Sequence, residues 1–170
     1  MKPDVEKFLK SADVNYVIHK HIPVATVAAS RRVCAAIPGL HCKNLFLKEK
    51  RGDNLYLLTM PAHKRLDFKA FQAAAGLRAL TFAKPDVMWD LMKIKPGSVS
   101  PLGLINDTQN RIKLFVDKEV WDAEIVGFHP NDNAATLEMT HENFEKVLNA
   151  LGNEWEVVEI EAEKCCISSG

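Results

Sequence analysis

The 170-residue sequence lacks any run of about 18 apolar residues, so it predicts no membrane-spanning helix. Its first ten residues are charged and do not resemble a secretory signal. Its four cysteines, Cys34, Cys42, Cys165 and Cys166, include no CxxC pair, and no Cys/His set has the spacing of a zinc site. We therefore expect a cytoplasmic protein with free thiols, no metal and no cofactor.

An excess of one charge is also missing, because 22 Lys and Arg balance 22 Asp and Glu. Proteins that bind long duplex nucleic acid usually carry a strong basic excess, so the balance argues against that class. A short nucleic-acid contact made by a few cations remains open. The sequence contains no P-loop, no Rossmann fingerprint and no GxSxG elbow, and no pair of carboxylates stands out as a general acid and base.

The hydrophobic patterns that are present predict a mixture of helices and strands within one domain over residues 3–160, followed by a tail at 161–170. The clearest signal is a β-hairpin, in which two apolar strands flank the turn RGDN. Since hairpins dominate, we expect an α+β fold with a mixed, largely antiparallel sheet surrounded by helices. Helices are predicted over 2–12, 26–37, 67–76, 84–94 and 140–151, and strands over 14–20, 44–48, 55–60, 79–83, 111–117, 124–130, 134–140 and 154–160.

Four of these helices have recognisable ends. Thr26, Asp67 and Thr140 stand where an N-cap residue would begin a helix, and Gly76 stands where a helix would end. Pro85 falls in the first turn of its helix, where the missing N–H costs nothing.

The segment KPGSVSPLGLINDT, residues 95–108, is predicted to be a loop. Gly97 can adopt positive φ and allows close approach to the backbone, while Pro101 stiffens the loop exit. Ser98, Val99 and Ser100 lie between them, and three N–H groups held rigidly could stabilise a developing negative charge. The GxxxP spacing alone is weak support for such a site, because many turns contain it.

Three side chains elsewhere could serve a site. Lys43 is either a solvated lysine at a strand edge or a fixed cation at the mouth of a pocket, and Asn44 beside it could cap a turn or orient a polar ligand. Strand alternation puts Lys43 on the face of two leucines, which would fit if that face ended at a cleft. His129 ends a strand before a proline, where it either bonds to the turn or lines a substrate pocket.

Taken together and in order, CKNLFLKEKRGDNLYLLTM, GSVSPLGLINDTQNRIKLFVD and VGFHPNDNAATLEMTHENFEKVL resemble the YbaK/ProX family of aminoacyl-tRNA trans-editing domains. These domains are related to the insertion domain of bacterial prolyl-tRNA synthetase. The resemblance covers about residues 3–160, and HIPVATV near the N-terminus resembles the family's segment with a threonine after the proline, here Thr26. Among the branches of this family, the quoted motifs most resemble the alanine-removing one.

The resemblance implies a carboxylic ester hydrolase that deacylates mischarged tRNA, with alanyl-tRNA(Pro) as the expected substrate. The family's lysine and asparagine match Lys43 and Asn44, its GxxxP loop matches Gly97–Pro101, and its pocket histidine matches His129. By the same resemblance we expect Lys43 and the loop to be catalytic, and Asn44, His129 and Thr26 to bind substrate. The partner is then the acceptor end of an aminoacyl-tRNA, with prolyl-tRNA synthetase as a further candidate and a monomeric protein as the expected state.

Two other interpretations remain open from the sequence. The protein could remove another small amino acid, such as cysteine, serine or threonine, from tRNA. It could instead be a non-catalytic tRNA-binding or regulatory module that keeps the fold without the activity.

Overall fold

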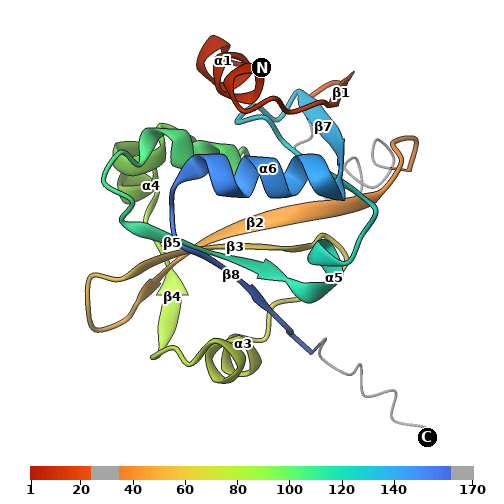
Figure 1. Ribbon diagram of the computed structural model, residues 1–170. Helices are drawn as coiled ribbons and strands as arrows, with labels where there is room; N and C mark the ends of the chain where they lie inside the picture. The colour runs from red at the N-terminus through yellow and green to blue at the C-terminus, as the bar shows by residue number, and fades with distance from the viewer. Residues whose placement is uncertain (24–34, 162–170) are drawn as a thin grey trace, which may run out of the picture.

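Two long strands, β2 (Leu40–Glu49) and β3 (Leu55–Pro61), cross the centre of the molecule as the predicted hairpin (Figure 1). Every residue of β3 is buried, because both faces of this strand are covered by other elements. The computed structural model describes residues 1–23 and 35–161. Within these ranges no helix is long and apolar enough to cross a membrane.

The hairpin lies inside one mixed sheet of eight strands, in the order β1-β7-β6-β2-β3-β5-β8, with β4 paired to β2. Four of the seven pairings are antiparallel and three are parallel, which confirms the predicted mixed sheet. The other strands are β1 (Val17–Lys20), β4 (Leu80–Phe82), β5 (Ile112–Asp117), β6 (Ile125–Phe128), β7 (Ala135–Thr140) and β8 (Trp155–Val158).

One edge of β2 has two different neighbours. β6 pairs with its first two residues, Leu40 and His41, and β4 pairs with its last three, Leu47–Glu49. In the described part of the chain, residues 42–45 have no strand beside them on that edge, and the Phe46 carbonyl accepts from Ala83 N just beyond the end of β4. The sheet therefore has a gap beside the middle of β2.

Helices cover the two faces of the sheet unequally. Figure 1 shows α1 (Pro3–Ser11), α4 (Pro85–Met92) and α6 (His141–Leu151) toward one face and α3 (Phe68–Ala75) beneath the other. Alternation along β2 divides its side chains between two cores: Phe46 belongs to the larger core, and Leu45 and Leu47 belong to the core under α3.

The predicted helix ends are confirmed wherever the structure describes them. The Asp67 carboxylate accepts from the amides of Lys69 and Ala70, and Gly76 ends the same helix in the left-handed conformation. Thr140 caps α6 by accepting from the Asn143 amide, and Pro85 opens α4. The predicted helix 26–37 lies largely outside the described residues.

The structure corrects the prediction of an unbroken loop over residues 95–108. Pro101–Asn106 form a short 3-10 helix, η1, because Pro101 already has the required φ and the Ser100 hydroxyl caps the Leu102 amide. The sequence prediction also missed α5 (Lys118–Trp121), whose first turn is capped by the Asp117 carboxylate. Both are short helices of one or two turns stabilised by local polar contacts, and they leave no periodic apolar pattern.

Candidate functional site

Asn44 links the sheet to the GxxxP loop. Its carboxamide nitrogen donates to the Val99 carbonyl at 3.1 Å, and its carboxamide oxygen accepts from the Thr59 hydroxyl at 2.7 Å. Thr59 lies directly opposite on β3 and is fully buried. We call this arrangement the Asn44 bridge. Because both ends of the carboxamide are engaged, its orientation and the position of Val99 are fixed together.

The three amides of the loop differ in their bonding. Ser98 N donates to the Lys95 carbonyl at 3.1 Å, because positive φ at Gly97 closes a turn there. The amides of Val99 and Ser100 donate to no group in the described ranges, and Ser100 is fully buried. Adjacent unused donors on a fixed loop are suited to holding an anionic oxygen once a substrate reaches them.

Packing holds the proline end of this loop in place. Gly97 is exposed, has φ +88°, and has no atom within 4 Å of the position where a Cβ would stand. Pro101 and Ser100 are buried, and a Cβ added at Gly103 would overlap the Ile94 side chain, so η1 packs closely against the segment after α4. The loop is therefore open at the glycine end and anchored at the proline end.

Lys43 does not share the contact that Asn44 makes with the loop. Its amine donates to the Lys64 carbonyl, and burial lowers the pKa of this amine from its ordinary value. The side chains of neighbouring strand residues point to opposite faces of the sheet, so Lys43 and Asn44 diverge. Asn44 and Val99 are therefore brought together, whereas the Lys43 amine rests against a backbone carbonyl on the other face.

The carbonyl that accepts from Lys43 belongs to a residue with its own charged contacts. The Lys64 amine pairs with Asp117 at 3.0 Å and with Glu119 at 3.0 Å. Burial alone would lower the pKa of Lys64, but its bonds to Glu119 and Asp117 outweigh burial and raise it. A cavity of about 590 Å³ opens beside this group, lined also by Leu40, Asp122 and Glu161 among others. None of the predicted site residues that the structure describes lines that cavity.

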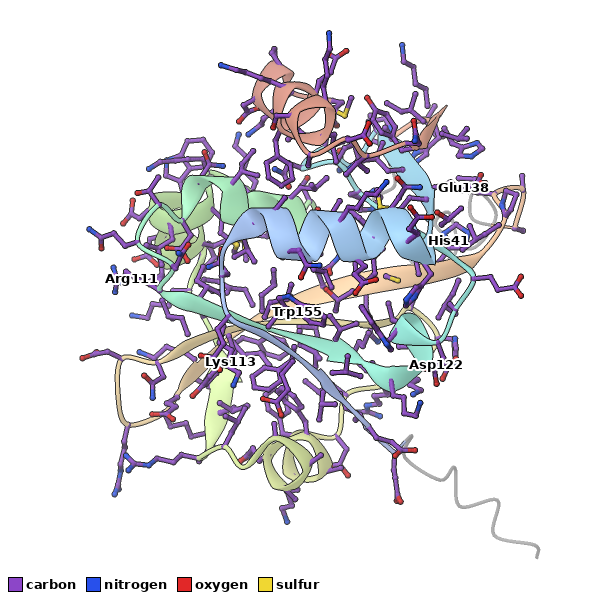
Figure 2. The ribbon with its side chains drawn as sticks, in the orientation of Figure 1. His41, Arg111, Lys113, Asp122, Glu138 and Trp155 are labelled. Carbon is purple, nitrogen blue, oxygen red and sulfur yellow. The ribbon has the colours of Figure 1, made fainter. Side chains whose placement is uncertain are left out.

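Three histidines gather where β2 meets β6 and β7. The rings of His21 and His129 have centroids 6.1 Å apart, and His41 lies against Gly127, its register partner on β6. A Cβ at Gly127 would approach both His41 Nδ1 and Thr136 Cγ2 at 3.4 Å, so glycine makes this close approach possible. Figure 2 shows His41 on the same side of the molecule as Glu138 of β7. Sequence spacing gave no sign of this group.

The contacts of His129 assign its tautomer. Nδ1 lies 2.8 Å from the Ala135 carbonyl, which can only accept, so Nδ1 carries the proton and the neutral ring keeps a lone pair on Nε2. Burial is the main cause that lowers the pKa of His129, and the neighbouring His21 and His41 lower it further, while the Ala135 bond opposes them. At neutral pH the ring is therefore an uncharged acceptor.

A second polar residue of the same strand connection was missed by sequence reasoning. Asn131 is 5% exposed, has φ +58°, and has no described partner for either polar atom of its carboxamide. An unsatisfied buried carboxamide is costly, so such groups often mark positions that a ligand or water completes. Thr59 was also missed, although a threonine inside a wholly apolar strand was a visible signal. Thr26 lies outside the described residues.

The described residues limit which chemistry is available. They contain no group of three His, Cys, Asp or Glu side chains arranged to hold a metal ion. Burial raises the pKa of the Cys42 thiol to about 12, so this thiol stays protonated and is a poor nucleophile. The unused amides on the loop that Asn44 holds can polarise a carbonyl group without a covalent intermediate.

Comparison with known proteins assigns the family. The profile of the aminoacyl-tRNA editing domain matches residues 21–147, three quarters of the chain. The chain belongs to the aminoacyl-tRNA editing domain family. It is 32% identical to the prolyl-tRNA editing protein ProX of Acetoanaerobium sticklandii, over 89% of this chain and 93% of that protein. It is 28% identical to mouse prolyl-tRNA synthetase associated domain-containing protein 1, over 91% of this chain and 93% of the relative.

Solved structures support the same fold for this editing domain. A crystal structure of a candidate trans-editing enzyme for prolyl tRNA synthetase superposes with a TM-score of 0.69 at 17% identity. The match covers 95% of this chain and 99% of that chain. At this identity the likeness establishes the architecture, and the resemblance stated from the sequence motifs is confirmed at the level of the family.

The tautomer and neutrality of His129 can be tested directly. We predict that NMR titration gives His129 a pKa below 6.5 and shows the proton on Nδ1 at pH 7.5. Because the unfolded chain then binds a proton before the native one does, the His129 contribution to unfolding free energy falls as pH drops below about 6.5. A His129→Asn variant should lose less stability between pH 7.5 and pH 5.5 than the wild type. A titration with a pKa at or above 6.5 would contradict the assignment.

Proposed function

We propose that this protein hydrolyses the ester bond of mischarged aminoacyl-tRNA, and that alanyl-tRNA(Pro) is its preferred substrate. The observation that carries the proposal is the pair of unused amides at Val99 and Ser100, on a loop tied to the sheet by the Asn44 bridge. Membership of the editing family and the likeness to ProX support the same reaction. The proposed preference for alanine rests on the sequence motifs around the GxxxP loop and His129, which resemble those of the alanine-removing branch.

The reaction needs little from the protein, because an aminoacyl ester is already activated. Water adds to the carbonyl carbon, and the carbonyl oxygen becomes an oxyanion that the Val99 and Ser100 amides stabilise. The ester C–O bond then breaks, the terminal ribose oxygen takes a proton, and the amino acid leaves as its carboxylate. The second hydroxyl of that ribose is suited to positioning the water. Loss of one such amide donor typically costs about 100-fold or more in rate.

Lys43 is proposed to hold the terminal phosphate or ribose of the tRNA. Its amine donates to a neutral carbonyl, that of Lys64. A phosphate is a stronger acceptor for an ammonium than a neutral carbonyl is, so substrate can draw the side chain away from Lys64. Lys43 lies on the same strand as Asn44, and a long flexible stem gives its amine the reach to turn around the open edge of β2.

We propose that the protein selects small amino acids by steric exclusion of larger ones at His129 and its neighbouring histidines. Attraction discriminates poorly, since a methylene group or two is worth roughly 1–3 kcal/mol. A rigid wall rejects a larger ring by collision instead, and His129 is held by its Ala135 bond and its histidine neighbours. Its neutral Nε2 can accept a hydrogen bond from the α-ammonium of the small amino acid. Thr26 is proposed to complete the substrate site.

The biological setting is proposed on the same basis. The substrate partner is the acceptor end of the tRNA, and prolyl-tRNA synthetase is a candidate protein partner because two relatives carry prolyl-tRNA names. We propose a cytoplasmic monomer that needs no cofactor, with residues 3–160 as the folded domain and 161–170 as a tail.

A panel of esters tests the reaction. Proline tRNA carrying labelled alanine, cysteine, serine, threonine or proline is incubated with the protein, and release of the label is measured. We expect alanine to be released fastest and proline to be spared. Fastest release of cysteine, serine or threonine would instead assign the protein to another small amino acid. Binding of the tRNA without release of the amino acid would indicate a tRNA-binding module. If neither binding nor release is observed, a regulatory role is indicated.

The Lys43 role predicts a loss of activity without a loss of fold. Lys43→Ala should reduce kcat/KM for the preferred ester by about 10- to 100-fold, the value of one hydrogen bond to a charged group. Lys118→Ala is the matched control, because this exposed lysine pairs only with Asp122. Circular dichroism and the Tm report folding of both variants. Wild-type activity in a folded Lys43→Ala protein would refute the role.

The glycine of the loop provides a test of loop geometry. Ala at position 97 must adopt φ +88°, which strains the backbone by about 1–2 kcal/mol although no side chain blocks it. Gly97→Ala should therefore displace the Val99 and Ser100 amides and lower the deacylation rate at least tenfold.

Gly76→Ala is a control for the same strain, since Gly76 has φ +65° and equally open surroundings at the end of α3. Both variants should lower the Tm by several degrees, and only Gly97→Ala should lose activity. Equal activity in the two variants would show that the loop backbone takes no part in the reaction.

A further inference from the structure

The whole chain has no net charge, but the first and second parts of its sequence carry net charges of opposite sign. Residues 1–111 hold 18 Lys and Arg against 9 Asp and Glu, whereas residues 112–170 hold 4 against 13. Figure 2 shows Arg111 on one side of the molecule and Asp122 on the other. The charge is therefore uneven along the sequence, although the net charge is zero.

Within the described residues, four basic residues of the first half have no ion-pair partner at the hairpin tip and the start of β4. In the second half, the lysines at 113, 118 and 146 all pair with carboxylates. By contrast, Lys48, Lys50, Arg51 and Arg78 form no ion pair within residues 1–23 and 35–161. Of the two acidic residues among them, Glu49 is buried against the Tyr56 hydroxyl, and Asp53 alone is exposed.

Backbone contacts gather these four cations at one place. Lys48 is the register partner of Thr81 on β4, and the Lys50 amide donates to the Ala79 carbonyl at 2.8 Å, directly after Arg78. The tip of the hairpin is thereby fixed beside β4. Figure 1 shows the hairpin tip and β4 on the same side of the molecule, away from α5.

An exposed aromatic ring stands at one end of this group, one position after Thr81 and on the opposite face of the sheet from Thr81 and its partner Lys48. Phe82 is 55% exposed at the end of β4 and contacts Phe68 edge to face, with ring centroids 5.4 Å apart. Phe82 is the register partner of Leu47, which lies four residues beyond Lys43 and on the same face of the strand. At about 3.3 Å per residue, the ring is roughly 13 Å along the sheet from Lys43.

We propose that Phe82, together with Lys48, Lys50, Arg51 and Arg78 of the adjoining hairpin tip and β4, forms a platform for the single-stranded end of the tRNA. A base upstream of the terminal adenosine stacks on Phe82, and the four cations hold the adjoining phosphates. Aromatic rings interleaved with unpaired cations are the usual means of binding single-stranded nucleic acid. The proposal rests on the proposed function, since it assigns the path that the acceptor end takes toward Lys43.

The test measures binding of uncharged RNA, which is independent of hydrolysis. Two probes are used: an acceptor-stem hairpin with its single-stranded 3′ end, and the same hairpin with that end removed. The wild type should bind the complete hairpin more tightly. Phe82→Leu should weaken this binding by about 5- to 150-fold, the value of one stacked base, and should bind both probes alike. Phe82→Tyr keeps an aromatic face and should restore wild-type binding.

The cations are tested by salt dependence. The double variant Lys50→Ala/Arg51→Ala should reduce the slope of log K against log salt by about 1.4, at about 0.7 for each lost phosphate contact. Lys118→Ala/Lys146→Ala, which removes two lysines from the acidic half, should leave the slope unchanged. The Tm of each variant verifies folding.

Wild-type affinity of folded Phe82→Leu for the complete hairpin, or an unchanged salt slope in the double variant, would overturn the platform. Equal binding of both probes by the wild type would also overturn the platform. The exposed Phe82 would then be assigned to contact with a protein partner. If the wild type binds the probes as expected and yet releases no amino acid from any ester, the proposed function fails while the platform stands.

Discussion

The site depends on one carboxamide that is engaged at both ends. Asn44 accepts from Thr59 through its oxygen and donates to Val99 through its nitrogen, so a residue on β2 transmits the rigidity of the sheet to the loop. Neither bond is strong by itself, at about 1 kcal/mol net. Together they select one orientation of the amide, because a flipped carboxamide would face the Thr59 hydroxyl with a donor and the Val99 carbonyl with an acceptor. The amides of Val99 and Ser100 are pre-organised by this choice.

The gap in the sheet explains why Asn44 is available for this purpose. β6 leaves β2 after His41, and β4 joins it only at Leu47, so the middle of the strand is rigid through β3 but uncovered on its other edge. A continuous sheet would bury that edge under another strand. An isolated loop would lack the support of β3. The combination places an edge without a described strand beside the loop, on the same strand as His41 and near the end of β6, where His129 follows.

Much of the fold follows from local sequence signals, and the details of the site do not. The hairpin, the caps at Asp67 and Thr140 and the stop at Gly76 depend on near neighbours, so pattern and spacing predict them. The bond from the Ser98 amide to Lys95 and the opposite faces of Lys43 and Asn44 are local features, whereas the gathering of three histidines depends on which strands become neighbours. Only the family resemblance pointed to Asn44 and the loop together. Thr59 was within reach, as a lone hydroxyl in an apolar strand whose partner was already predicted.

The charge distribution shows how a whole-chain average can mislead. A net charge of zero argued against extended duplex binding, and that argument still holds for the acidic half, where each described lysine is paired. In the basic half, residues 1–111, binding depends on local charge and not on the average over the chain. At physiological salt, charges interact over about 8 Å, so a phosphate near Lys50 responds to the cations beside it and hardly at all to carboxylates across the molecule. A short single strand can therefore be held at the edge of β4 by the local cations, even though the whole chain carries no net charge.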